Sequence, residues 1–205
     1  MSLFGRTGKG APFDWLVVGL GNPGPKYIGT RHNVGEDVVK LLAERHREQL
    51  KGGRDNALTA ETRFGAPGND ERVVLSFPIT YMNESGQAVG AQVRRYRIAS
   101  VDRIVVIHDE LDLDPGILRV KEGGGLAGHN GLRSITAHTK SQDYLRVRIG
   151  VGKPPSGAGK NYVLSKVPKS ERERLDIAVV DAADAVELII SDGVEAAMRR
   201  YNIKQ

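Results

Sequence analysis

A short apolar run near the N-terminus, followed by a glycine- and proline-rich loop and an amphipathic segment, constrains the fold most strongly. Asp14 to Leu20 reads DWLVVGL, which is the length and composition of a strand buried on both faces. After the Gly21-Asn-Pro-Gly-Pro25 loop, Val34, Val38, Leu41 and Leu42 share one helical face. This spacing predicts a helix to about Leu50, with Asn33 and Glu36 as a cap pair at its start.

The rest of the chain continues to interleave strand and helix signals. Strands are expected at 57–64, 72–77, 103–108, 117–121 and 144–151, and helices at 85–98 and 130–138. The first two of these strands flank a turn cluster at 65–70, which indicates a hairpin. After a loop at Lys153 to Gly159, we expect one long helix that opens with the capping box Ser170-Glu-Arg-Glu173 and ends at Gly193.

Interleaved strands and helices with one internal hairpin predict an α/β protein. The expected architecture is a single-domain three-layer sandwich, with a mixed, mostly parallel twisted sheet flanked by helices. Residues 1–13 are rich in glycine and offer little to bury, so we expect a flexible N-terminal arm followed by one domain at 14–205.

Composition excludes several classes of protein. The chain of 205 residues contains no cysteine, which rules out disulfides, thiolate metal sites and a cysteine nucleophile. We find no run of about 18 apolar residues and no signal-peptide pattern, so we expect a cytoplasmic protein without membrane contact. The net charge of +5 weakly favours an anionic partner such as RNA.

The glycines at 19, 21 and 24 match the G-x-G-x-x-G pattern of dinucleotide-binding folds, which makes a nucleotide-dependent oxidoreductase one alternative. Pro23 removes a backbone donor where a pyrophosphate needs one. The acidic residue at the appropriate distance, Glu44, falls inside the predicted helix instead of ending a strand. The glycines are therefore better interpreted as turn residues.

Two polar groups are expected at the same edge of the sheet. His32 follows the first loop, and a second buried strand ends in His108-Asp109-Glu110, so parallel strands would bring His32 and Asp109 together. An imidazole backed by a carboxylate can activate water, although a helix start and a turn residue explain the same pattern. His46 and His138 are expected on polar helix faces, in contact with solvent.

Two further clusters of charged residues each allow either a functional or a purely structural interpretation. Asp109, Glu110, Asp112 and Asp114 could hold a divalent cation, but they lack EF-hand spacing, and a solvated loop is the simpler reading. Lys121 precedes the glycines at 123–125, which is compatible with a phosphate site or with an ordinary surface turn.

Five ordered motifs together resemble the bacterial peptidyl-tRNA hydrolase family. They are Val18-Gly-Leu-Gly-Asn-Pro-Gly24 with Tyr27 and Thr30-Arg-His-Asn33, Pro78-x-x-Tyr-Met-Asn83-x-Ser-Gly86, His108-Asp-Glu-Leu-Asp-Leu113, Gly123-Gly-Gly-x-x-Gly-His-Asn-Gly131 and Arg146-x-Arg148-Ile-Gly150. The resemblance extends from about Trp15 into the last helix. Ala127 departs from it, because family members usually carry glycine there, and this affects the expected shape of the loop.

The resemblance implies a monomeric hydrolase, without metal or cofactor, that cleaves the ester between a peptide and the terminal ribose of tRNA. It assigns water activation to His32, orientation of that histidine to Asp109, and support of the oxyanion to Asn22. The remaining assignments are substrate contacts by Tyr27, Met82, Asn83 and Asn130, and contacts with the tRNA 5′ phosphate by Lys121 and Arg148. An RNA-binding protein on the same scaffold without hydrolytic activity, like the chloroplast intron-splicing relatives, remains the main alternative.

Overall fold

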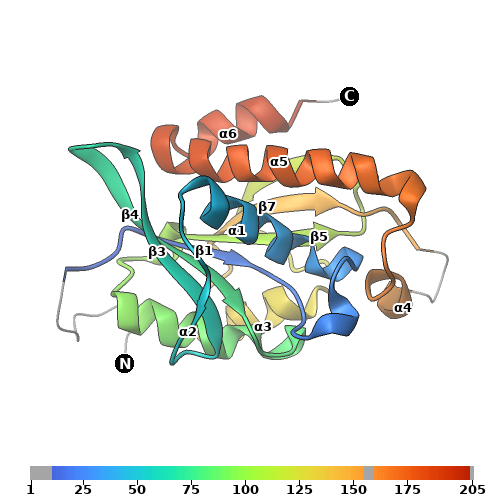
Figure 1. Cartoon of the computed structure of the whole chain (residues 1–205), viewed down its shortest axis with the longest axis horizontal. Coiled ribbons are helices and arrows are strands. Elements are labelled where there is room, and N and C mark those ends of the chain that lie inside the picture. Colours follow the sequence, from blue (N-terminus) through green and yellow to red (C-terminus); the bar gives the residue numbers. More distant parts are fainter. Residues whose placement is uncertain (1–10, 155–158, 204–205) are drawn as a thin grey trace.

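A seven-stranded mixed sheet runs through the middle of the computed structural model, which describes residues 11–154 and 159–203 (Figure 1). The strands are β1 (Trp15–Gly19), β2 (Lys51–Gly52), β3 (Ala57–Ala66), β4 (Asn69–Pro78), β5 (Ile104–Glu110), β6 (Leu118–Glu122) and β7 (Leu145–Gly150). Their order across the sheet is β2-β3-β4-β1-β5-β7-β6. This architecture confirms the predicted α/β fold with a mixed sheet flanked by helices.

The four central strands β4, β1, β5 and β7 are parallel, and β3 and β6 pair antiparallel with their neighbours. Val17 of β1 lies opposite Leu75 of β4 on one side and Val105 of β5 on the other. All five residues of β1 are buried, as its continuous apolar sequence predicts. The carboxyl ends of the central strands therefore meet at one edge of the sheet.

Helices cover both faces of the sheet. They are α1 (Val34–Arg45), α2 (Ser85–Tyr96), α3 (Asn130–Thr139), α4 (Gly159–Val163), α5 (Lys169–Asp192) and α6 (Val194–Tyr201). Helices α1, α5 and α6 form one layer, and α2 and α3 form the layer on the opposite face (Figure 1). Each face contributes its own apolar cluster, so the sheet is buried between two cores.

Two glycines allow α1 to pack directly against the central strands. A Cβ on Gly19 would lie 2.1 Å from the carbonyl oxygen of Gly35, and one on Gly35 would lie 2.4 Å from that of Ile107. Only glycine permits such close approach of two backbones. The first glycine of the apparent dinucleotide fingerprint is thus explained by packing of a helix on a strand.

The helix boundaries differ from the predictions in two places. Helix α1 ends at Arg45 and not near Leu50, because Arg47 adopts a left-handed backbone conformation with φ of 58°. His46 therefore lies beyond the helix, where its ring stacks on Phe64 at 4.0 Å and its Nε2 contacts Glu187 at 3.1 Å. The prediction that His46 is solvated on a helix face is wrong, since the folded chain brings an aromatic ring and a carboxylate to it.

The C-terminal region also differs from its predicted form. Three helices follow Gly159 where one was expected, although Gly193 does end the longest of them. Helix α5 begins at Lys169 after Pro168, and no side-chain cap forms there. The predicted capping box of Ser170 and Glu173 does not form, because the helix has already begun at Lys169 and Ser170 lies inside its first turn instead of at the N-cap.

The domain begins earlier than expected from the composition of residues 1–13. Phe13 is buried, its ring packs edge-on against Tyr96, and its backbone N–H donates to the carbonyl oxygen of Tyr96 at 2.9 Å. Phe13 is thus packed with the domain instead of belonging to the expected arm, and residues 1–10 of that arm lie outside the described part of the chain. Within the described residues, no helix has the length and apolar character needed to cross a membrane.

Candidate active site

A cleft of about 850 Å³ opens at the edge of the sheet where β1, β4 and β5 end. It is lined by Asn22, Tyr27, His32, Tyr81, Met82, Asn83, Asp109, Glu110, Leu111, Ala127, Gly128, His129, Asn130, Gly159, Val163 and Leu164. All the predicted catalytic and substrate-binding residues are therefore brought to one place. Crevices outside the carboxyl ends of parallel strands are the usual ligand sites of open α/β sheets.

A histidine and an aspartate meet in this cleft. His32 lies in a short 3₁₀ turn before α1, and its Nδ1 is 2.8 Å from Oδ1 of Asp109 at the end of β5. Burial by itself raises the pKa of Asp109, but the neighbouring imidazoles of His32 and His129 outweigh it and hold the pKa well below its ordinary value. Asp109 is therefore ionised, and the Nε2 atom of His32 remains available for the cleft.

His129 is a member of this cluster that the sequence analysis did not assign to the site. It caps helix α3, because its Nδ1 accepts from the backbone N–H groups of Gly131 at 3.2 Å and Leu132 at 3.4 Å. Its Nε2 lies 3.1 Å from Oδ1 of Asp109. With Nδ1 accepting, Nε2 carries the proton and donates to the carboxylate. His129 thus acts as a neutral donor that holds Asp109.

The three residues His32, Asp109 and His129 are the one group among the described residues whose donor atoms are close enough for a metal, within 4.8 Å of one another. A metal ligand must present a lone pair, but Nε2 of His129 bears the proton required by the helix cap. The donor set thus suits a hydrogen-bonded triad better than a metal centre. The acidic cluster of the sequence is divided, since Asp109 and Glu110 are buried in β5 while Asp112 contacts Lys153 at the surface.

His108, the residue before Asp109, is fully enclosed by the protein. Burial, followed in effect by the nearby His129, lowers the pKa of His108 to about 3. Its Nδ1 is 2.7 Å from the backbone carbonyl oxygen of Asp109, so the neutral ring donates to the strand end that carries the Asp109 carboxylate. His108 therefore contributes no positive charge to the cleft near neutral pH.

The side-chain amide of Asn22 has a defined orientation. Its Oδ1 accepts from the backbone N–H of Met82 at 2.9 Å, so its Nδ2 is the polar group left for a ligand in the cleft. The backbone of Asn22 is held by Asn33, whose Oδ1 accepts from the Asn22 N–H at 3.0 Å and whose Nδ2 donates to the Asn22 carbonyl oxygen at 2.9 Å. Asn33 therefore does not cap α1 with its side chain as predicted, because the amide is committed to this loop.

Polar and apolar side chains share the cleft wall. Asn83 and Asn130 line the cleft with exposed amide side chains, whereas Met82 in the same lining is buried. Tyr27 is half-buried, with Lys26 over its ring at 4.7 Å. Tyr81 also lines the cleft and is more than half exposed, and from the sequence it was recognisable only as part of a motif.

Lys121 and Arg148 do not line the cleft. Lys121 pairs with Arg146 across β6 and β7, which makes Arg148 its diagonal neighbour on the same face of the sheet. Arg148 binds Glu110 through Nε at 3.1 Å and Nη2 at 3.0 Å, and Glu110 itself borders the cleft. The two cations therefore lie on one face beside the site, with Arg148 already paired to a carboxylate.

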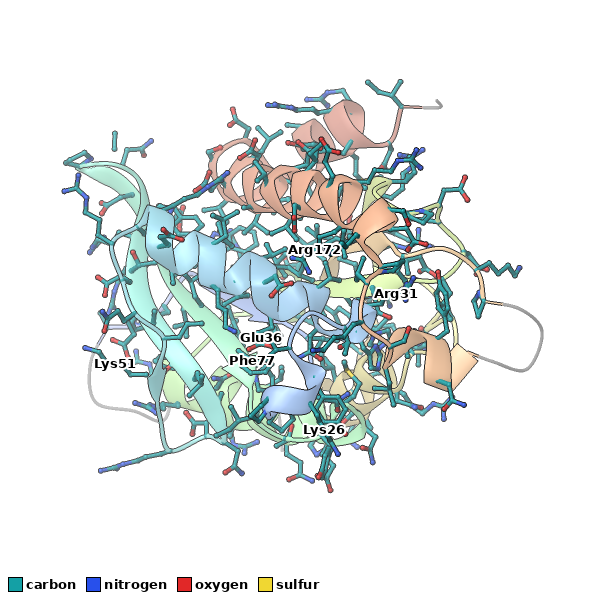
Figure 2. The ribbon with its side chains drawn as sticks, turned by 45° about the vertical axis from the view of Figure 1, so that its right-hand side comes forward. Lys26, Arg31, Glu36, Lys51, Phe77 and Arg172 are labelled. Carbon is teal, nitrogen blue, oxygen red and sulfur yellow. The ribbon has the colours of Figure 1, made fainter. Side chains whose placement is uncertain are left out.

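A buried arginine connects the loop that carries His32 to the C-terminal part of the chain (Figure 2). Arg31 donates to Ser165 Oγ and to Glu171 Oε2, both at 2.8 Å, and stacks on the ring of Tyr162 at 4.1 Å. Helix α4, which lies next to this segment, provides the cleft wall with Gly159 and Val163. Arg31, which directly precedes His32, therefore attaches this wall of the cleft to the loop of His32.

An α/β protein with a histidine–aspartate pair at the carboxyl edge of its sheet belongs to a class that includes many hydrolases. Similarity to known proteins identifies the family within this class. The family model described as peptidyl-tRNA hydrolase matches residues 16–205. A peptidyl-tRNA hydrolase of Cutibacterium acnes is 49% identical over 197 residues, which cover 92% of this chain and 98% of the relative. A peptidyl-tRNA hydrolase of Streptomyces coelicolor is 48% identical over 199 residues, which cover 96% of this chain and 98% of the relative.

A crystal structure of peptidyl-tRNA hydrolase from Acinetobacter baumannii is similar throughout, with a TM-score of 0.84 and 38% sequence identity. The match covers 96% of this chain and 99% of that one. This chain belongs to the peptidyl-tRNA hydrolase family. The resemblance inferred from the five motifs is confirmed.

Proposed function

We propose that this protein hydrolyses the ester bond between a peptide and the terminal ribose of tRNA, and so returns the tRNA to translation. The observation that carries the proposal is the hydrogen bond of 2.8 Å between His32 and Asp109 in an open cleft. The names and high similarity of the relatives support the same substrate.

His32 acts as the general base in this reaction. Its Nε2 takes a proton from a water molecule as the water oxygen attacks the ester carbonyl carbon. The carboxylate of Asp109 stabilises the imidazolium that forms and keeps Nδ1 protonated. When the tetrahedral intermediate collapses, the bond to the ribose oxygen breaks, and the imidazolium returns a proton to that oxygen.

Asn22 supports the negative charge that develops on the carbonyl oxygen. Its Nδ2 is the available donor, because Oδ1 is occupied by the N–H of Met82. Asn83 and Asn130 bind main-chain groups of the peptide, which suits a substrate whose side chains vary. Tyr27 and Met82 contact the substrate around the scissile ester.

Lys121 and Arg148 bind the 5′-terminal phosphate of the tRNA, with the acceptor stem lying along this face of the sheet. Their diagonal arrangement across β6 and β7 places two cations on one side, as a compact anion requires. Glu110 holds the guanidinium of Arg148 at Nε and Nη2, which leaves Nη1 for a phosphate oxygen.

The proposed chemistry uses only protein groups, so we propose that it needs no metal or cofactor. We further propose that the enzyme acts as a monomer in the cytoplasm, where its substrate is produced. EDTA should leave hydrolysis unchanged provided that the tRNA itself stays folded, and a divalent ion required by the protein would contradict this part of the proposal.

Release of tRNA from two matched substrates tests the proposed function. The protein is incubated with an N-acetylated aminoacyl-tRNA and with the same aminoacyl-tRNA carrying a free amine. We expect rapid release from the blocked substrate and little from the free-amine one. Tight binding of tRNA without release would instead support an RNA-binding protein on this scaffold, and indifference to both substrates would overturn the proposal.

A further inference from the structure

A nearly buried carboxylate lies directly behind the amide of Asn33. Glu36 lies in the first turn of α1 (Figure 2). Its Oε2 accepts from Nδ2 of Asn33 at 2.7 Å. Its other oxygen, Oε1, contacts the ammonium of Lys40 at 2.6 Å, and its side chain is only 9% exposed. Glu36 is thus held between one amide and one cation, at a helix start where negative charge is favoured.

The carboxylate determines which way the Asn33 amide points. A carboxylate only accepts hydrogen bonds, so Asn33 must turn its NH₂ group toward Glu36 and its Oδ1 away from it. In this orientation Oδ1 accepts from the Asn22 N–H, while the second hydrogen of Nδ2 reaches the Asn22 carbonyl oxygen. The reversed amide would place oxygen against oxygen at Glu36 and against the carbonyl at Asn22.

We propose that Glu36 is a positioning residue for the reaction, acting through the Asn33 amide to fix the backbone, and hence the side-chain amide, of Asn22. The inference rests on the proposed role of Asn22 as the oxyanion donor. Without the carboxylate, the Asn33 amide loses the acceptor of its shortest hydrogen bond, and the two bonds by which it holds the loop of Asn22 are left less firmly fixed. Because a donor must lie close to the developing oxyanion, a small displacement reduces catalysis more than it reduces binding.

A simpler role for Glu36 would be to pair with Lys40 four residues later and to complement the helix dipole. Asp37 provides the matched control for that role. It lies in the same first turn of α1 and is also a carboxylate, but its partner is Arg172 at 3.8 Å on α5. Replacing Asp37 removes a charge from the same helix start and leaves Asn33 untouched.

Steady-state kinetics with N-acetylated aminoacyl-tRNA compare Glu36→Met, Glu36→Gln and Asp37→Ala. Met has about the volume of Glu but accepts no strong hydrogen bond, so we expect kcat to fall about tenfold with KM nearly unchanged. Gln can still accept from Asn33 through its amide oxygen, so it should restore kcat to within about threefold of the parent. Asp37→Ala should behave as the parent enzyme does. If Glu36→Met does not fold, Glu36→Asp, whose shorter side chain cannot reach Asn33, takes its place.

A double-mutant cycle separates positioning from a general loss of structure. If Glu36 acts through Asn22, Glu36→Met should have little further effect on kcat in an Asn22→Ala background. Equal losses in the two backgrounds would overturn the inference.

The side-chain amide resonances of Asn22 and Asn33 in the NMR spectrum give a readout independent of activity. We expect both to shift in Glu36→Met and to stay in place in Asp37→Ala, and unmoved Asn22 resonances in Glu36→Met would also overturn the inference. A parental kcat in the single variant Asn22→Ala would instead contradict the proposed role of Asn22, while the resonances would still report whether Glu36 orients the amide.

Discussion

One carboxylate oxygen, Oδ1 of Asp109, receives hydrogen bonds from two histidines with different functions. His129 uses its other nitrogen to cap a helix, which keeps its ring neutral and fixes the direction of its donor. His32 has its second nitrogen available for the cleft, so it can accept a proton. At the scale of single residues, the two histidines therefore differ in the ring nitrogen that does not contact Asp109. In His32 this nitrogen is available to act as the proposed base, whereas in His129 it is occupied by the helix cap.

Replacing the proposed base should abolish most of the activity without preventing binding. We expect His32→Ala to lower kcat by a factor of about 10²–10⁴, the usual contribution of a general base. The affinity for tRNA, measured by fluorescence anisotropy, should stay near that of the parent because His32 makes no proposed phosphate contact. A kcat within a few-fold of the parent would contradict the assignment.

Replacing Asp109 should change the pH profile as well as the rate. The ionised carboxylate favours the protonated imidazole of its partner, and only the unprotonated imidazole can act as a base. In Asp109→Asn the base should therefore remain unprotonated to lower pH, so the acidic limb of kcat/KM should move to lower pH while the maximum rate falls. The measurement is kcat/KM between pH 4.5 and 9, and an acidic limb that stays in place would refute the pairing.

At the scale of elements, the cleft is assembled from segments far apart in the sequence. A short antiparallel bridge joins Thr30 to Lys166, and the N–H of Val167 donates to the carbonyl oxygen of Gly29 at 3.1 Å. The side chain of Arg31 strengthens this junction through Glu171. The wall formed by α4 is thus attached to the loop of His32 by backbone and side-chain contacts together.

Removing the carboxylate of Glu171 should loosen this junction. Arg31 is only 6% exposed at its side chain, so Glu171→Ala leaves a buried cation with fewer partners and should cost about 1–2 kcal/mol of stability. We expect faster hydrogen exchange at the backbone amides of Arg31 and Val167, and a KM several-fold higher. Glu173→Ala, on an exposed position of the same helix, is the control, and the same exchange rates in both variants would show that Arg31 does not hold the wall.

At the scale of the whole molecule, the proposed recognition of tRNA combines the cleft with the neighbouring face of the sheet. The cleft contains the groups proposed for the ester, while the cations at β6 and β7 lie outside its lining. This division predicts that contacts with the tRNA body and chemistry at the ester can be altered separately.

Substitution of Lys121 or Arg148 by Ala should weaken binding of intact tRNA and leave the chemistry unchanged. We expect a higher KM for full-length substrate and a salt dependence whose slope in log KM against log salt falls by about one, because one phosphate contact is lost. Hydrolysis of a minimal peptidyl-adenosine ester, which lacks a 5′ end, should be nearly unaffected. Equal effects on both substrates would identify the two residues as ordinary surface cations.

Removing the 5′ phosphate from the tRNA tests the same contact from the other side. Dephosphorylation should raise KM for the parent enzyme and add little to the defect of the Lys121→Ala and Arg148→Ala double variant. Losses that add in full would show that the phosphate and these side chains do not meet.

The sequence by itself determined the alternation of strands and helices, the mostly parallel direction of the strands, and the one edge of the sheet at which His32 and Asp109 are both expected. Each of these follows from a local pattern, such as the continuous apolar runs at 15–20 and 104–107, whose burial on both faces requires a central position in a parallel sheet. Once two such strands are parallel, the residues at their carboxyl ends lie at one edge.

Only the tertiary structure decided which partners the buried polar groups have. Glu36 and Glu171 each occupy a position typical of a capping residue, but one binds the amide of Asn33 and the other binds Arg31. In the sequence His129 only follows a glycine-rich loop, whereas in the structure it donates to Asp109, which lies 20 positions earlier. The physical reason is that periodicity along a chain reports burial, whereas a buried donor or acceptor must pair with whichever group the packed fold places within about 3 Å.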